Sequence, residues 1–255
     1  MALFTDGSIS APMELQNYES GILSVANTEG IDLAAKLTLA RDDVANQVMM
    51  FLLRRLTVRD FHWNQRRARG LTDVVVTPAL KQWHAHKTLA LVFRDAYNNQ
   101  LNDRYMGKWN EYEALAKASS EVFFQIGVGL VGDPLPKPAT PILSTTAGPS
   151  PAATYYVAVT WVNRASQEGS PSDIGEITTA AGQQPVVEVV SPPSNAIGWN
   201  AYVGQSPDGI SIQNTVPLGT SDHWVLSTAL RPGTPPGAGQ QPNWFFVDHR
   251  VIERG

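Results

Sequence analysis

The sequence contains no cysteine, which excludes disulfide bonds, thiolate catalysis and cysteine-based zinc sites. It also lacks an apolar run of the length that a membrane span requires, since the stretch MMFLLRRL is too short and contains two arginines. The start, MALFTDGSISAPMEL, lacks a basic region followed by an apolar run, so we expect no signal peptide. The net charge of −4 indicates neither a nucleic-acid-binding nor a membrane-surface protein.

Proline is scarce in the first half of the chain. Only 2 of the 18 prolines, Pro12 and Pro78, precede residue 130, and this half carries 14 basic and 14 acidic residues. Residues 131–255 carry 5 basic and 9 acidic residues and are rich in Pro, Gly, Ser, Thr and Val. The contrast predicts an α+β multidomain protein, an N-terminal α-helical bundle followed by a β-sandwich. The boundaries we expect are a helical domain at 1–131, a proline-rich linker at 132–141, a sandwich at 142–230, and a flexible arm with a C-terminal segment at 231–255.

Four helices are predicted in the first half by apolar residues at spacings of three and four. Thr77 is a good N-cap and Pro78 suits the first helical position, so the third helix begins there. The expected helices cover about 11–25, 31–55, 78–101 and 102–125.

Two histidines, His84 and His86, lie one residue apart on the third predicted helix. On a helix they point in different directions, so they do not share a metal ion. His86 falls within the apolar stripe, and we expect a core histidine that is hydrogen-bonded to a neighbour. His84 lies near Lys81 and Thr88, and we expect it to be solvated.

The second half contains several short runs with strand-like alternation, separated by Pro/Gly turns such as QEGSPSD and SPDG. Such runs over about 90 residues predict a β-sandwich. The expected strands are 154–163, 174–180, 185–191, 198–204 and 223–229.

Motifs for enzymatic chemistry are missing or misplaced. The stretch GVGLVG matches the dinucleotide fingerprint formally, but it follows a helix and opens a proline-rich linker, so we interpret it as a helix C-cap with a turn. The sequence has no P-loop, H-E-x-x-H or G-x-S-x-G motif. We therefore expect neither an enzyme nor a cofactor.

One basic cluster stands out in the first half. Residues 54–69 carry five net positive charges, since Asp60 is the one acid among them. They either contact phosphate or an acidic protein surface, or form a solvated loop whose charge is balanced elsewhere. Phe61 and Trp63 favour a contact, and both interpretations stay open. The candidate contact residues are Arg54, Arg55, Arg59, Arg66, Arg67 and Arg69.

The helical half resembles the head-to-tail adaptor (connector or head completion) proteins of tailed bacteriophages. The stretches GIDLAAKLTLARDDVANQV, LKQWHAHKTLALVFRDAYNNQLNDRYMGKWNEYEALAKAS and GVGLV carry this resemblance, which covers 1–131. Residues 140–230 are similar to the Ig-like or fibronectin-type modules of phage structural proteins, through TYYVAVTWVNRASQEGSPSD and GWNAYVGQSPDG. The shortest adaptors lack such a module.

The resemblance implies a structural virion protein in the neck, made in the host cytoplasm and not bound to a membrane. It implies a homo-oligomeric ring of about twelve copies beneath the portal, with a channel for the genomic DNA. The partners it implies are the portal protein, tail or tail-terminator proteins, and that DNA.

The C-terminal segment of such proteins often docks into the portal. Residues 243–255 are a plausible equivalent, because an extended apolar segment can add a strand to a neighbour's sheet. The alternative is that they fold back as an edge strand of their own sandwich. The candidate docking residues are Trp244, Phe245, Phe246, Val247, Val251 and Ile252.

A second function stays open, that of a carbohydrate- or surface-binding module carried by the Ig-like domain. Trp199, Tyr202 and Trp224 would then be stacking platforms for sugar rings; otherwise they belong to the sandwich core.

Overall fold

A computed structural model describes residues 1–56, 70–101, 103–227 and 229–247, of which 54–56 are described by their backbone. The chain forms two units, and the mixed α+β class is confirmed. The helical unit contains Gly7–Leu130 and the chain from Pro242 onward. The β unit contains Met1–Asp6 and Val131–Gln241.

The main segment of the β unit, Val131–Gln241, is thus inserted between two segments of the helical unit. This differs from the expected linear order, in which the chain after 231 was a free arm and tail. The reason is that strand β9 (Trp244–Phe246) pairs with strand β1 (Val128–Leu130), directly after the last helix.

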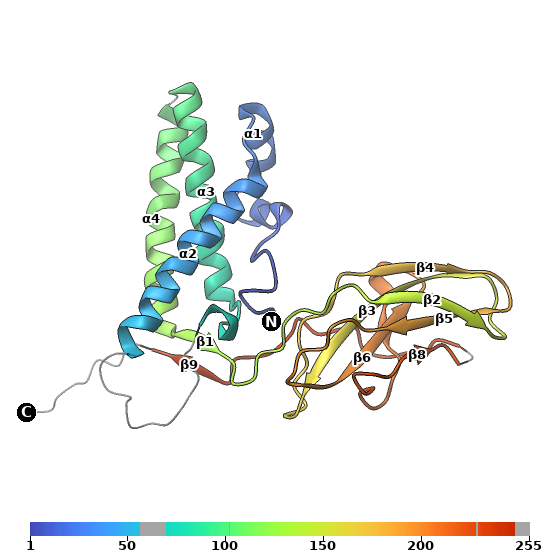
Figure 1. The fold of residues 1–255 in the computed structure, drawn as a ribbon. Coiled ribbons are helices and arrows are strands. Elements are labelled where there is room, and N and C mark those ends of the chain that lie inside the picture. Colours follow the sequence, from blue (N-terminus) through green and yellow to red (C-terminus); the bar gives the residue numbers. More distant parts are fainter. Residues whose placement is uncertain (57–69, 102, 228, 248–255) are drawn as a thin grey trace, which may run out of the picture. The chain divides into compact units, whose positions relative to one another are not determined.

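The helical unit is built on a long antiparallel pair, α3 and α4, crossed by α2 (Figure 1). As predicted, α3 begins at Pro78, and the Thr77 hydroxyl accepts a hydrogen bond from the Leu80 N–H at 3.3 Å. The helix expected at 11–25 is divided into two short helices. The helices are η1 (Pro12–Asn17), α1 (Ile22–Glu29), α2 (Leu33–Leu56), η3 (Leu71–Asp73), α3 (Pro78–Gln100) and α4 (Asp103–Ile126).

The core of the helical unit lies between α3 and the elements around it. The Phe93 and Tyr112 rings stack with their centroids 5.6 Å apart, which joins α3 to α4. The Tyr112 hydroxyl donates to Glu19 Oε2 at 3.0 Å and so connects α4 to the chain before α1. The buried residues of this core include Leu15, Ile22, Leu37, Ala85, Leu89, Val92, Phe93 and Tyr112.

The β unit consists of two antiparallel sheets, with strand orders β2-β5-β8 and β4-β3-β6-β7. One apolar core draws residues from both sheets, among them Trp161, Val187 and Trp199. Alternate residues of β3 enter this core, as the two-residue period predicts. The strands are β2 (Ile142–Ala147), β3 (Ala153–Asn163), β4 (Gly175–Thr179), β5 (Gln183–Glu188), β6 (Ala196–Gly204), β7 (Ser211–Ile212) and β8 (Trp224–Val225).

The segment expected to be a flexible arm is held against the β unit. The Thr234 carbonyl accepts a hydrogen bond from the Ile212 N–H at 3.0 Å. Gln240 is buried; its Oε1 accepts from the Leu135 N–H at 2.7 Å and its Nε2 donates to the Asp133 carbonyl at 2.9 Å. These bonds attach the expected arm at 231–242 to the β unit and to the linker expected at 132–141, so neither segment is an independent linker.

Candidate interaction surface of the helical unit

A two-stranded ribbon, β1 with β9, closes one end of the helical unit. The register pairs Val128 with Phe246 and Leu130 with Trp244, and the Asn243 N–H donates to the Leu130 carbonyl at 2.9 Å. Val74 forms a bridge to Leu130 on the other side of β1. Strand β9 is therefore an integral part of this unit and belongs to neither sheet of the β unit.

Two glycines make the ribbon possible. Gly127 ends α4 with φ at +104°, and its N–H donates to the Phe123 carbonyl at 2.9 Å, as the C-cap interpretation of GVGLVG predicts. A Cβ on Gly127 would lie 2.5 Å from Val247 Cγ1, and one on Gly129 would lie 2.9 Å from Pro242 Cγ. The predicted turn after the cap is instead strand β1.

An aromatic cluster packs where α2, α3 and α4 meet the ribbon. The Phe51 ring lies 4.8 Å from that of Phe124 and 5.7 Å, edge to face, from that of Phe246. The rings of Phe123 and Phe124 both lie 5.5 Å from that of Trp83. Phe246 thus joins β9 to the helices through its side chain as well as its backbone.

The C-terminus of α2 and strand β9, which precede the two segments singled out in the sequence, lie at this same end of the helical unit (Figure 1). Residues 57–69 follow the C-terminus of α2, one turn after Phe51, and the chain returns at η3 before the Val74 bridge to β1. Arg54 and Arg55 belong to the last turn of α2, while Arg59, Arg66, Arg67 and Arg69 lie outside the described residues.

The candidate docking residues are likewise divided. Trp244 and Phe246 are half-buried in the ribbon, Phe245 is exposed, and Val251 and Ile252 lie outside the described residues. Docking on a portal stays a prediction. Within the described part of the chain, Phe245 is the residue of β9 with a side chain available to a partner.

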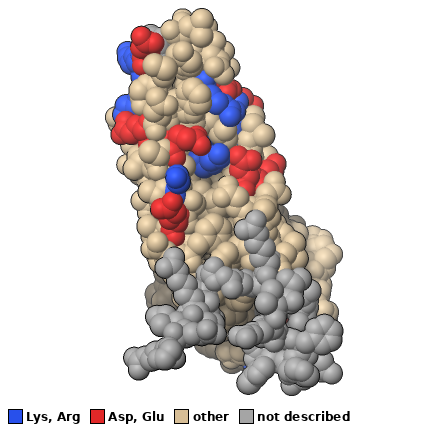
Figure 2. All heavy atoms as spheres, turned by 90° about the vertical axis from the view of Figure 1, so that its left-hand side faces the viewer, with Lys and Arg blue, Asp and Glu red and all other residues tan. Residues whose placement is uncertain are grey.

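Charge is distributed unevenly along the helical unit. Residues 7–53 and 70–130 hold 8 basic and 12 acidic side chains, a net charge of −4, whereas 54–69 hold 6 arginines and Asp60, a net charge of +5. Several lysines of the helices are engaged by acids, as in Lys81 with Glu14 at 2.6 Å. On the face drawn in Figure 2, basic and acidic side chains alternate without a patch of one sign. Positive charge in excess is therefore confined to 54–69.

Two helices carry apolar side chains on their solvent side. On α4, Leu115, Val122 and Ile126 are 38–50% exposed and flank the buried face. On α2, Met50 and Leu53 are about half exposed, opposite the buried Val44 and Val48. We call these the α4 stripe and the α2 stripe. In the sequence, both stripes are a second apolar row at helical spacing beside the row that is buried.

The two histidines have separate environments and do not form a metal site. His86 Nδ1 lies 2.7 Å from Ser119 Oγ, as expected for a core histidine. His84 is buried rather than solvated: Nδ1 lies 3.2 Å from Ser10 Oγ and Nε2 lies 3.0 Å from the Leu37 carbonyl. Burial lowers the pKa of both rings. Among the described residues, no three His, Asp or Glu side chains are grouped closely enough to hold a metal ion.

The aromatic residues considered as sugar platforms are mostly part of the β-unit core. Trp199 and Tyr202 are buried; the Trp199 indole N–H donates to the Gly219 carbonyl at 3.0 Å, and the Tyr202 hydroxyl donates to Glu168 Oε1 at 2.6 Å. Burial and then this hydrogen bond raise the pKa of Tyr202. Of the three, Trp224 borders a described cavity.

No model of a known protein family and no curated protein sequence matches this chain. Within the described ranges, no helix combines the length and the apolar character that crossing a membrane requires.

Proposed function

We propose that the chain is a head-to-tail adaptor of a tailed bacteriophage. In this proposal it is a non-enzymatic structural protein of the virion neck, and about twelve copies form a ring that joins the portal to the tail around the DNA channel. The β unit is an appended Ig-like β-sandwich, supported by its three-stranded and four-stranded antiparallel sheets around a tryptophan-containing core.

The exposed α2 and α4 stripes are the observation that carries this proposal. A closed ring needs a head-to-tail interface, in which one surface of a subunit meets a different surface of the next. Two apolar rows on two different helices of one unit supply such a pair of surfaces. Exposed apolar side chains that share one row of a helix suit burial against a partner.

The basic residues and the C-terminal segment near the ribbon support the same function. Residues 54–69 carry five excess positive charges. The described elements that flank them are α2, which contacts β9 through Phe51, and η3, which is followed by the Val74 bridge to β1. Arginines there would contact DNA phosphates in the channel or the acidic rim of a partner ring. Val247, the last described residue, directly follows β9, and the segment after it is the one that we propose docks on the portal.

Complementation of tail attachment tests the proposal. A phage that cannot make this protein is expected to produce filled heads and free tails, which purified wild-type protein joins into infectious particles. Val122→Glu, which places a charge in the α4 stripe, is expected to abolish joining. Met106→Glu, also on α4 but outside the stripe, is the matched control and retains joining. Tailed, infectious particles made without the protein would refute the proposal.

A further inference from the structure

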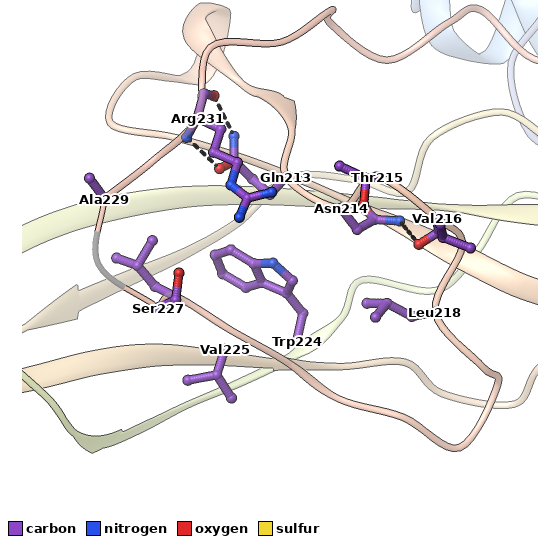
Figure 3. A pocket seen from close by; sticks show the side chains of 11 residues that line it. Gln213, Asn214, Thr215, Val216, Leu218, Trp224, Val225, Ser227, Ala229 and Arg231 are labelled. Atoms are coloured by element: carbon purple, nitrogen blue, oxygen red, sulfur yellow. Dashed lines mark hydrogen bonds between the residues drawn. The ribbon is translucent and has the colours of Figure 1, made fainter.

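The β unit contains a small cavity beside β8, separate from every surface assigned above (Figure 3). Its volume is about 240 Å³, and all of its lining residues belong to 213–231 of this one unit. The volume is below the roughly 300–1,000 Å³ of pockets for drug-sized ligands, so the cavity suits a ligand of about one ring.

The cavity wall combines apolar side chains with polar ones, and its apolar part is formed by Trp224 and aliphatic residues. The indole of Trp224 lies at its centre, with Leu218 and Val225 on either side (Figure 3). Trp224 is 9% exposed, so part of its surface remains accessible while the rest anchors the ring in the core. A ligand that enters would place an apolar body against these groups.

The two amides in the wall are already satisfied within the protein. Gln213 Oε1 accepts from the Arg231 N–H at 2.8 Å, and its Nε2 donates to the Arg231 carbonyl at 3.0 Å. Asn214 Nδ2 donates to the Val216 carbonyl at 2.8 Å, and its Oδ1 accepts from the Ala201 N–H at 2.8 Å. Because these amide groups are hydrogen-bonded within the protein, they hold the wall in place, and a ligand must be recognised by other groups.

Arg231 is the one charged residue among those that line the cavity. Gln213 holds the Arg231 backbone through two hydrogen bonds. The Arg231 side chain is exposed, and in Figure 3 its guanidinium points toward the part of the cavity where the Trp224 indole lies. Among the described residues, no carboxylate lies within ion-pair distance of it. A guanidinium presents a planar pair of donors that matches a carboxylate.

We propose that this cavity binds a small monocarboxylate with a single apolar ring or branched chain as its body. Arg231 binds the carboxylate, and Trp224 with its aliphatic neighbours receives the body. Gln213 is a positioning residue that holds the Arg231 backbone. This chemistry is shared by free aryl or aliphatic acids and by the C-terminal residue of a peptide. The inference does not depend on the ring-forming function.

Titration of the full-length, nitrogen-15-labelled protein with benzoate tests this proposal. The indole N–H signal of Trp224, assigned with Trp224→Phe, is expected to shift with a dissociation constant on the order of 1 mM. Benzamide, which has the same shape without the charge, is expected to bind at least about tenfold more weakly. Arg231→Gln is expected to weaken benzoate binding by a similar factor, and Arg164→Gln, an exposed arginine elsewhere in the unit, is the matched control.

N-acetyl-leucine and a longer peptide ending in leucine, each compared with its amidated form, separate the two sources. Binding of both acids supports the peptide terminus as the source, and binding of the short acids alone supports a free small molecule. The proposal is overturned if benzoate at about 20 mM leaves the Trp224 signal unchanged. It is also overturned if benzamide binds as tightly as benzoate, or if Arg231→Gln binds as tightly as the wild type.

Discussion

Replacing Phe246 by alanine probes whether the C-terminal strand belongs to the helical unit. The Phe246 ring is half-buried and packs edge to face on Phe51, and its backbone pairs with Val128. Truncating a fully buried Phe costs about 3–5 kcal/mol, so a half-buried one should cost roughly 2 kcal/mol. The lost aromatic pair is included in this figure.

For a helical unit of this size, a loss of about 2 kcal/mol lowers the melting temperature by roughly 5–10 °C. Thermal unfolding followed by the far-ultraviolet circular dichroism of the helices measures it. Phe245→Ala is the control, because the neighbouring side chain is exposed and its loss should shift the melting temperature by about 1 °C or less. Equal melting temperatures for the two variants and the wild type would show that β9 does not stabilise the helices.

Three further predictions concern other parts of the chain. Joining Leu130 to Trp244 through Asn-Gly, a two-residue hairpin turn, should give a folded helical unit without the β unit. A chain ending at Thr140 should unfold at a lower temperature, because β1 then has no partner strand. Equal melting temperatures of the two proteins in circular dichroism would contradict this. Burial lowers the pKa of His84, so below about pH 6.5 the unfolded state binds more protons than the folded state, and the free energy of unfolding should fall between about pH 7 and pH 5. In urea unfolding, His84→Gln should reduce the dependence of this free energy on pH, and an unchanged dependence would contradict the prediction. Replacing Arg66, Arg67 and Arg69 by alanine should reduce assembly or DNA retention, more so at high salt, while Lys117→Ala should not; normal particle yield and DNA retention would leave the solvated-loop interpretation.

The helices were predictable because their signals are local. The Thr77 cap and the period of three to four residues fix α3 without tertiary information, and the two-residue period fixes β3 equally well. The ribbon was not predictable, since strands of three residues show no measurable period. Its pairing of Val128 with Phe246 also joins residues far apart in the sequence.

Burial of single residues depended on neighbours that the sequence does not identify. His84 lies off the apolar stripe of α3, yet Ser10 and Leu37 cover it from other elements. The exposed α2 and α4 stripes could be counted as apolar rows, but only the packed unit shows that no described element covers them. The place of the arginines along the chain was predictable, while the contact between the C-terminal part of α2 and β9 required the fold.

The central claim is that copies of this chain form a closed ring between portal and tail. Cryo-electron microscopy of particles from an infected host, reconstructed about the tail axis, tests it most directly. The account predicts density for the helical unit in a ring of cyclic symmetry directly beneath the portal, with the α2 stripe of one copy facing the α4 stripe of the next. Density for this fold elsewhere in the particle, or particles that lack the protein and still carry tails, would contradict the account.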